Sequence, residues 1–176
     1  MAVPAMSSMS AKKAPIPPLK ISRAKKSDIP TIRDFIRRLA EYEKLSHEMK
    51  ATQSLLREHL FGSKRAAEVI IAKLGKKPVG FALFFTTFST FVGRPGIWLE
   101  DLFVLPDNRR QGVGRALLRV VAQIAVQRKC GRLEWSVLDW NQPAIRLYRK
   151  LGAKAMDQWT IQRVTGPALR RLAKKI

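Results

Sequence analysis

The sequence predicts a single domain of mixed α/β fold, and three observations support this. The chain has 176 residues, which is about the size of one domain and enough for a substantial core. Hydrophobic residues make up 46% of it, and short apolar runs alternate with stretches of helical spacing. No apolar run reaches the roughly 18 residues that cross a bilayer, so we expect neither a transmembrane helix nor a membrane partner.

The first half of the chain predicts a strand, two helices and a hairpin, in that order. Residues 19–24 alternate between apolar and polar side chains, as a strand does. Ser27 is a suitable N-cap for a helix that runs to about Leu45, and a shorter helix follows over residues 52–60. The apolar runs 66–74 and 79–88 flank the turn sequence Gly-Lys-Lys-Pro, so we expect them to form a hairpin.

The second half predicts strands and helices in alternation. Residues 97–104 form an apolar strand that two acids interrupt, and a helix over 112–129 follows, which Gly131 ends as a C-cap. The remaining predicted elements are a strand over 132–138, a helix over 143–151 capped by Asn141, a strand over 159–164 and a short basic helix over 167–175. The predicted order is therefore β-α-α-β-β-β-α-β-α-β with a short C-terminal helix, around a mixed central sheet.

The charge of the chain is strongly unbalanced, with 34 Lys and Arg against 13 Asp and Glu, a net charge of +21. This predicts attraction to an anion, which is nucleic acid, an anionic lipid or a small phosphorylated ligand. Residues 1–18 are predicted to be a disordered basic leader, and residues 19–176 the folded domain. The start lacks a secretory signal, so a cytoplasmic location is expected. One cysteine and two histidines predict no disulfide and no metal site.

The strongest local signal is the sequence Arg109-Arg110-Gln111-Gly112-Val113-Gly114-Arg115, which follows a strand and opens a helix. Its two glycines let backbone amides come close to an anion, and the start of a helix favours phosphate. No Gly-Lys-Ser/Thr follows and no third glycine is present, which excludes a nucleotide P-loop and a dinucleotide-binding loop. Taken alone, the segment is equally well explained as a glycine turn with solvated arginines.

This Arg-x-x-Gly-x-Gly sequence resembles the acetyl-CoA pyrophosphate loop of the GNAT superfamily of N-acetyltransferases, and the element order over residues 19–165 matches that fold. Further stretches are similar to the diamine (spermidine/spermine) N-acetyltransferase group, and the Leu-Asp-Trp-Asn sequence is most similar to its thialysine-acetylating branch. These stretches are Glu41–Glu43, Trp98–Val104, Leu138–Tyr148 and Leu151–Ala153.

The resemblance implies an N-acetyltransferase that transfers acetyl from acetyl-CoA to a small diamine, polyamine or lysine-like amine, and a homodimer. The residues that it implies for acetyl-CoA are Leu102, Phe103, Val104, Arg109, Arg110, Gln111, Gly112, Val113, Gly114, Arg115, Asn141, Pro143 and Ala144. Those that it implies for the amine are Tyr42, Glu43, Asp101, Asp139 and Trp140. A solvated helix end explains Tyr42 and Glu43 equally well, and a core aromatic explains Trp140 equally well.

Two residues are predicted to be catalytic. By the same resemblance, Tyr148 is the general acid that protonates the thiolate of CoA, and the alternative is a core tyrosine on an amphipathic helix. Glu100 is a carboxylate in an apolar strand, and the family suggests that it removes a proton from the amine. Side chains alternate along a strand, so Glu100 and Asp101 face opposite ways unless a bulge intervenes. Glu100 is favoured as the base, and Asp101 then holds a distal ammonium or pairs with a cation.

One departure from the family narrows the substrate. Residues 88–93 lack the acid and the tryptophan that the diamine acetyltransferases carry before the central strand, which removes an anchor for a second ammonium. This favours a shorter amine. The basic ends motivate two alternatives, an enzyme that acetylates protein amines and a nucleic-acid-binding module without catalysis. The second is less favoured, because the basic residues lack an RNA-recognition or KH signature.

Overall fold

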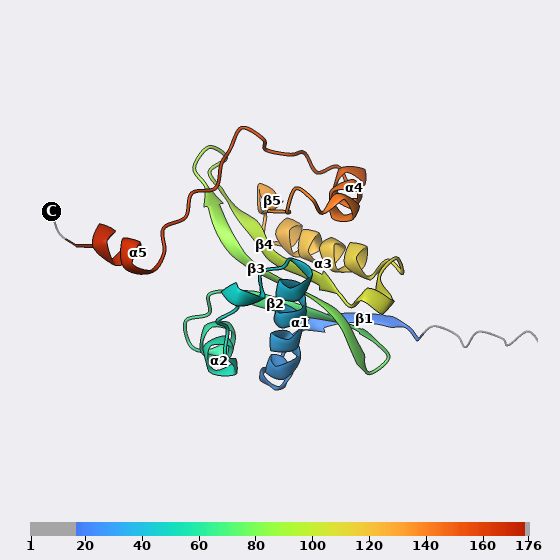
Figure 1. Cartoon of the computed structure of the whole chain (residues 1–176). Helices are drawn as coiled ribbons and strands as arrows, with labels where there is room; N and C mark the ends of the chain where they lie inside the picture. The colour runs from blue at the N-terminus through green and yellow to red at the C-terminus, as the bar shows by residue number, and fades with distance from the viewer. Residues whose placement is uncertain (1–16, 175–176) are drawn as a thin grey trace, which may run out of the picture. The chain divides into compact units, whose positions relative to one another are not determined.

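The structure, a computed structural model, describes residues 17–174 (Figure 1). Nearly all of the predicted leader, residues 1–16, and the last residue of the predicted C-terminal helix, Lys175, lie outside the described residues. The chain divides into two compact units, one that ends at Ser136 and one that begins at Val137. Within residues 17–174, no helix is long and apolar enough to cross a membrane.

The first unit is built on a mixed sheet of five strands in the order β1-β2-β3-β4-β5. The strands are β1 (Leu19–Arg23), β2 (Glu68–Leu74), β3 (Lys77–Ser89), β4 (Arg94–Val104) and β5 (Arg132–Trp135). Neighbouring strands are antiparallel, except that β4 and β5 are parallel. A parallel pair needs a long crossover, and the helix α3 (Val113–Gln127) supplies it.

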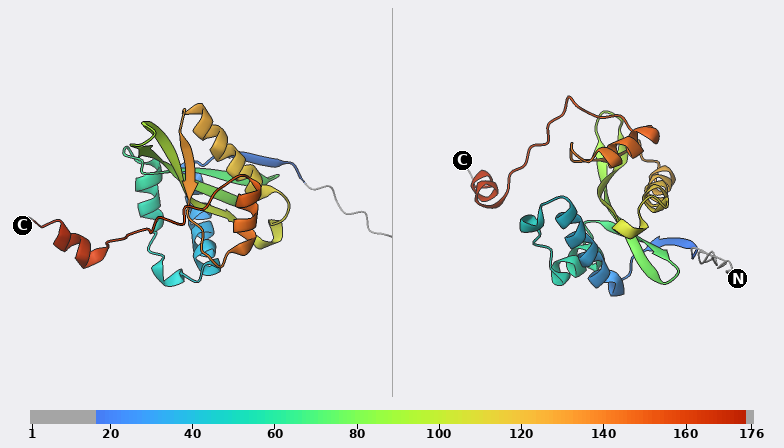
Figure 2. Two further views of the ribbon diagram at one scale, coloured as in Figure 1. Left: turned by 90° about the horizontal axis from the view of Figure 1, so that it is seen from above. Right: turned by 45° about the vertical axis from the view of Figure 1, so that its right-hand side comes forward.

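Helices cover both faces of this sheet (Figure 2). The helices α1 (Ile29–Tyr42) and α2 (Gln53–Phe61) lie on one face and α3 on the other. Alternate residues of β2 serve the two faces: Val69 and Ile71 belong to the core beneath α1, while Ile70 between them is also buried. Both faces of β2 are therefore apolar, as the continuous run Val-Ile-Ile-Ala indicates.

The start and end of α1 differ from the prediction. Ser27 lies inside a short 3₁₀ helix, Lys26–Asp28, and the Lys25 N–H donates to Asp28 Oδ2 at 2.8 Å, so α1 begins at Ile29. The helix ends at Tyr42, three residues earlier than predicted. Lys44 has a φ of 61°, which a continuing helix does not allow. Because the helix ends here, residues of the loop that follows it line the site described below.

The second unit contains α4 (Gln142–Lys150) and α5 (Gly166–Leu172). The predicted strand over residues 159–164 is wrong, because these residues have irregular backbone in the structure. A strand needs a neighbour for its N–H and C=O groups, and the apolar residues here bury no face: Trp159 is 71% exposed and Ile161 66%. Without this strand, the sheet has five strands instead of the six that the sequence predicts. The strand β5 is also shorter than predicted and ends at Trp135 instead of residue 138.

Candidate active site

The strand β4 has a free edge over its second half. The strand β5 pairs only with Gly96–Leu99, whereas β4 continues to Val104. On that side, the backbone of residues 100–104 has no strand partner in the described sheet. The predicted acetyl-CoA residues Leu102, Phe103 and Val104 lie here. An extended ligand could therefore form backbone hydrogen bonds along this edge.

The loop before α3 leaves the first N–H groups of this helix without a capping side chain. Arg110 and Gly112 have φ values of 61° and 81°, so the backbone turns sharply into the helix. A Cβ atom at Gly114 would lie 3.7 Å from Val104 Cγ2, an ordinary contact, so packing within the chain does not require glycine there. Open amides at the start of a 15-residue helix suit a phosphate, and a glycine with free space beside it suits its close approach.

Arg109, in the same loop, connects three elements. Its Nε donates to the carbonyl oxygen of Val104 at 3.0 Å. Its guanidinium carbon lies 4.5 Å from the ring centre of Tyr42 and 5.9 Å from that of Phe103. Stacking of this kind stabilises by about 0.5–2 kcal/mol. Arg109 thus joins the loop before α3, the free edge of β4 and the end of α1. Its contact with acetyl-CoA stays a prediction.

The other predicted loop residues divide by exposure. Arg110 and Arg115 are exposed, whereas Val113 is buried, so that only its backbone is open to a ligand. The Gln111 side chain donates to the carbonyl oxygen of Asp107 at 3.0 Å and holds the loop in shape. The two arginines supply positive charge at the surface of the loop.

A β-bulge decides where the two acids of β4 point. Leu83 of β3 pairs with Asp101, but the next residue, Phe84, pairs with Leu99, so Glu100 is the extra residue. Glu100 and Asp101 consequently line the same groove instead of facing opposite ways. The Trp98 indole N–H donates to Glu100 Oε2 at 2.8 Å, and Glu100 is exposed, whereas Asp101 is half-buried.

This groove, which we call the acidic groove, has a volume of about 380 Å³. It lies between α1, the loop over residues 43–51, and β4. Apolar side chains form much of its wall, and these are Ile36, Leu39, Ala40, Leu45, Met49 and Ala51. Its charged residues are Glu43, Glu48, Lys50, Glu100 and Asp101. An apolar wall with carboxylates suits an alkylamine.

Two carboxyl groups of the acidic groove have raised pKa values. Burial, with further contributions from the charges of Glu100 and Glu43, raises the pKa of Asp101 to about 7. Burial also raises the pKa of Glu43. A carboxyl group with a pKa near 7 exchanges protons readily at neutral pH, which a general base requires. Within residues 17–174, no three His, Cys, Asp or Glu side chains are arranged to hold a metal ion.

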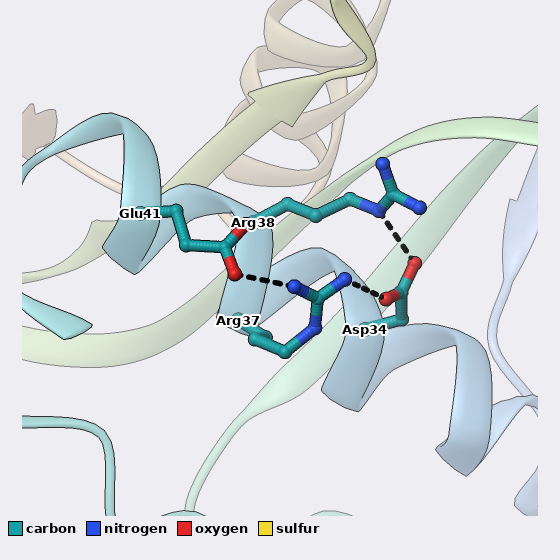
Figure 3. A network of polar contacts seen from close by, with 4 residues as sticks. All are labelled: Asp34, Arg37, Arg38 and Glu41. Carbon is teal, nitrogen blue, oxygen red and sulfur yellow. Dashed lines mark hydrogen bonds and ion pairs between the residues drawn. The ribbon is translucent and has the colours of Figure 1, made fainter.

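Acids elsewhere on α1 are paired, which sets the acidic groove apart (Figure 3). Arg37 bonds both Asp34 and Glu41, and Arg38 Nε lies 2.8 Å from Asp34 Oδ2. Burial opposes ionisation of Asp34, but hydrogen bonds from Arg37 and Arg38 outweigh it and lower its pKa. Asp34 and Arg38 line a second cavity, of about 700 Å³, beside the β2–β3 turn. Asp34 is a poor base because its pairing with the arginines lowers its pKa. The acidic groove is therefore the candidate amine site.

The second unit carries the remaining predicted residues on or next to α4. Asn141 Oδ1 accepts the N–H of Ala144 at 3.4 Å, and Pro143 occupies the first turn, as expected for a helix start. Asp139 and Trp140 lie in the preceding turn, and Tyr148 lies within α4, half-buried. Local structure thus explains Asn141 and Pro143, and the roles of Asp139, Trp140 and Tyr148 stay predictions.

Among the residues of the acidic groove that sequence reasoning missed are Glu48, Met49 and Lys50. They lie in the loop between α1 and α2, where no periodic pattern or motif marks them. Only the early end of α1 and the packing of this loop bring them to the groove. The structure does bring Glu43, Glu100 and Asp101 together in one groove, whereas Asp139, the fourth acid that the sequence offers to an amine, is not among the residues that line it.

Comparison with known proteins decides the family. The sequence model described as Acetyltransferase (GNAT) family matches residues 30–153. The chain belongs to the GNAT acetyltransferase family. As a GNAT protein it shares its fold with many solved structures. One of these is an integron cassette protein from the mobile metagenome of V. cholerae, which is 27% identical to this chain. The two structures superpose with a TM-score of 0.74, over 89% of this chain and 98% of that one.

Several relatives of this GNAT enzyme are full-length matches. A thialysine N-epsilon-acetyltransferase from Bos taurus is 38% identical, over 88% of this chain and 97% of the relative, and its counterpart from Mus musculus is 36% identical, over 88% and 96%. An L-ornithine N5-acetyltransferase from Arabidopsis thaliana is 30% identical over 88% of each chain. A spermidine/spermine N(1)-acetyltransferase-like protein from Homo sapiens is 30% identical over 76% of this chain, but only over 20% of that longer protein. The protein is therefore an N-acetyltransferase that resembles the thialysine branch.

Proposed function

We propose that this N-acetyltransferase transfers the acetyl group of acetyl-CoA to the side-chain amine of a lysine-like substrate, or of a small diamine or polyamine. The observation that carries the proposal is the bulge in β4, which puts Glu100 and Asp101 into one apolar-walled groove directly beside the free edge of the same strand. A donor arm along that edge and an amine in the groove would meet at Asp101 and Leu102.

The chain's own features support acetyl-CoA as the donor. The free edge of β4 offers backbone groups to the pantetheine arm, and the open amides at the start of α3 suit the pyrophosphate. Gly114 leaves space that packing within the chain does not need. An N–H of Leu102–Val104 would donate to the thioester oxygen and stabilise the charge that develops on it.

We assign proton removal to Asp101, with Glu100, which the sequence favoured, as the alternative. A primary ammonium has a pKa near 10 and must lose a proton before it attacks. The raised pKa of Asp101, about 7, makes its carboxylate the better acceptor at neutral pH. Glu100 is exposed and already accepts a hydrogen bond from Trp98. In this assignment Glu100 and Glu43 attract the ammonium.

The reaction then has three steps. Asp101 takes one proton from the ammonium, directly or through water. The neutral nitrogen attacks the thioester carbon, and a new C–N bond forms while the carbonyl oxygen gains negative charge. The C–S bond breaks as the carbonyl re-forms, the nitrogen loses its second proton to water, and the CoA thiolate takes a proton from Tyr148. The role of Tyr148 comes from its place in the Asn141–Tyr148 motif.

The similarity to enzymes named for thialysine and for L-ornithine supports an amino acid with a side-chain amine as acceptor. The lack of an acid in residues 88–93 points the same way, since it removes an anchor for a distant ammonium. A homodimer, which the family resemblance implies, and a cytoplasmic location, which the sequence leads us to expect, remain part of the proposal. Sedimentation of the purified chain and fractionation of cells would test them.

The experiment is a thiol-release assay with acetyl-CoA and a panel of lysine, thialysine, ornithine, diamines and polyamines. We expect turnover with the lysine-like amines. Asp101→Asn should lower kcat/KM by about 10²-fold or more, and Glu100→Gln by clearly less, because general bases contribute about 10²–10⁴-fold. The reverse order would make Glu100 the base. Turnover with lysate proteins and with none of the small amines would replace the proposal with the protein-acetylating alternative.

A further inference from the structure

Lys50 is the one basic side chain among the described residues that line the acidic groove. It follows the short 3₁₀ helix Ser46–Glu48 in the loop before α2. It is exposed, and none of the ion pairs in the described part of the chain involves it. Its ammonium is therefore available to an anionic group that enters the groove.

The cation and the acids of β4 come from different elements. Lys50 lies in the loop before α2, whereas Glu100 and Asp101 lie on β4. No ion pair among the described residues joins Lys50 to either acid, so Lys50 is not bound to the groups that would receive the amine. The groove has two chemically different regions, carboxylates on β4 and a cation with Glu48 in the loop, and apolar side chains supply most of the rest of its lining.

A diamino acid has the complementary arrangement of groups. Its terminal amine suits the carboxylates of β4, and its methylene chain suits the apolar wall. Its α-carboxylate suits Lys50, and its α-ammonium suits Glu48. The diamine formed by removing the carboxylate carries an ammonium alone at that end, and Lys50 repels it. A groove of about 380 Å³ is near the lower end of the roughly 300–1,000 Å³ of ligand sites, which suits a substrate of this size.

We propose that Lys50 binds the α-carboxylate of a diamino acid and so makes this enzyme select the amino acid over the corresponding diamine. The inference rests on the proposed function, because it assumes that the acidic groove receives the amine. It assigns specificity to a residue outside the motifs that the sequence shares with the family.

The test compares substrates that differ only in the carboxylate: ornithine with putrescine, and lysine with cadaverine. The readout is the ratio of kcat/KM for the amino acid to that for the diamine. Wild type should favour the amino acid. Lys50→Gln should lower the ratio by about tenfold, which is the size of one charge-assisted contact, and Lys50→Glu should lower it further or reverse it. The change should appear mainly in KM, with the KM for acetyl-CoA unchanged.

The control is Lys76→Glu, which makes the same change in net charge on an exposed residue of the β2–β3 turn, away from the groove. It should leave the ratio unchanged, and an equal fall with this control would overturn the inference. A wild-type preference for diamines, or an unchanged ratio in both Lys50 variants, would also overturn it while leaving the proposed function intact. Absence of turnover with every amine would refute the proposed function itself, and the role of Lys50 with it.

Discussion

Replacing Asp101 with asparagine tests the central feature of the site, a carboxyl group kept partly buried beside two other acids. Its pKa in the folded chain is about 7, against 3.8 in the absence of these surroundings. The difference of about 3 pH units corresponds to roughly 4 kcal/mol at 1.36 kcal/mol for each unit. The folded state therefore holds a proton on Asp101 that the unfolded chain has lost between pH 4 and pH 7.

The direction of the effect on stability follows from this proton. Since the folded chain binds more protons than the unfolded chain in this range, the contribution of Asp101 is fully present below about pH 4 and is lost as pH rises through about 7. Asparagine does not titrate. The free energy of unfolding of Asp101→Asn should thus exceed that of wild type by an amount that grows from pH 4 to pH 7, by up to about 4 kcal/mol.

Urea unfolding of both proteins from pH 4.5 to pH 8.5 measures this difference, and Asp157→Asn, an exposed acid, is the control. The same pair reports on catalysis. The kcat/KM of wild type should rise with pH through about 7, as the carboxylate forms, and Asp101→Asn should lose this step together with at least about 10²-fold of activity. A stability difference that does not change with pH would refute the burial argument, and a retained pH step would refute Asp101 as the base.

Three further predictions concern the glycines at the start of α3, Arg109 and Tyr148. Gly114→Ala should raise the KM for acetyl-CoA about tenfold, while the free energy of unfolding stays the same or increases by up to about 1 kcal/mol. Gly112 has a φ of 81°, so Gly112→Ala should lower the free energy of unfolding by about 1–2 kcal/mol, measured in urea. An unchanged KM for Gly114→Ala would remove the phosphate site from α3. Arg109→Lys keeps the charge but loses the hydrogen bond to Val104 and the planar group that stacks on Tyr42. We expect a loss of about 1 kcal/mol in the free energy of unfolding, and a larger rise in the KM for the amine than in the KM for acetyl-CoA. The opposite KM pattern would indicate that Arg109 contacts a phosphate. Tyr148→Phe should lower kcat by about 10²-fold without weakening acetyl-CoA binding, and a neutral result would exclude the acid role.

Much of the fold could be predicted because it is encoded locally. The hairpin of β2 and β3, the helix α3 and the cap of α4 by Asn141 all follow from apolar spacing and turn residues that lie next to one another in the chain. The predicted strand over residues 159–164 failed for the opposite reason. Apolar residues can favour a strand, but only a neighbouring strand can satisfy its backbone, and no local pattern reports whether one is present.

The acidic groove shows the same division. The motif residues Glu43, Glu100 and Asp101 are recognisable in the sequence, but a strand without a bulge would send Glu100 and Asp101 to opposite faces. The bulge arises from the register of β3 against β4, which leaves Glu100 as an extra residue, and no local sequence pattern reports this register. Lys50 and Glu48 reach the groove through the packing of an irregular loop, which has no periodicity to read.

The sequence by itself determined the reaction family, the glycine loop that opens α3 and the acids available to an amine, because motifs and helix starts are short-range features. Only the tertiary structure decided which carboxyl group is buried enough to have a pKa near 7, that Arg109 stacks on Tyr42, and that Lys50 shares a groove with the acids. Burial, stacking and proximity depend on segments far apart in the chain, and electrostatic energies depend on the distances that folding creates between them.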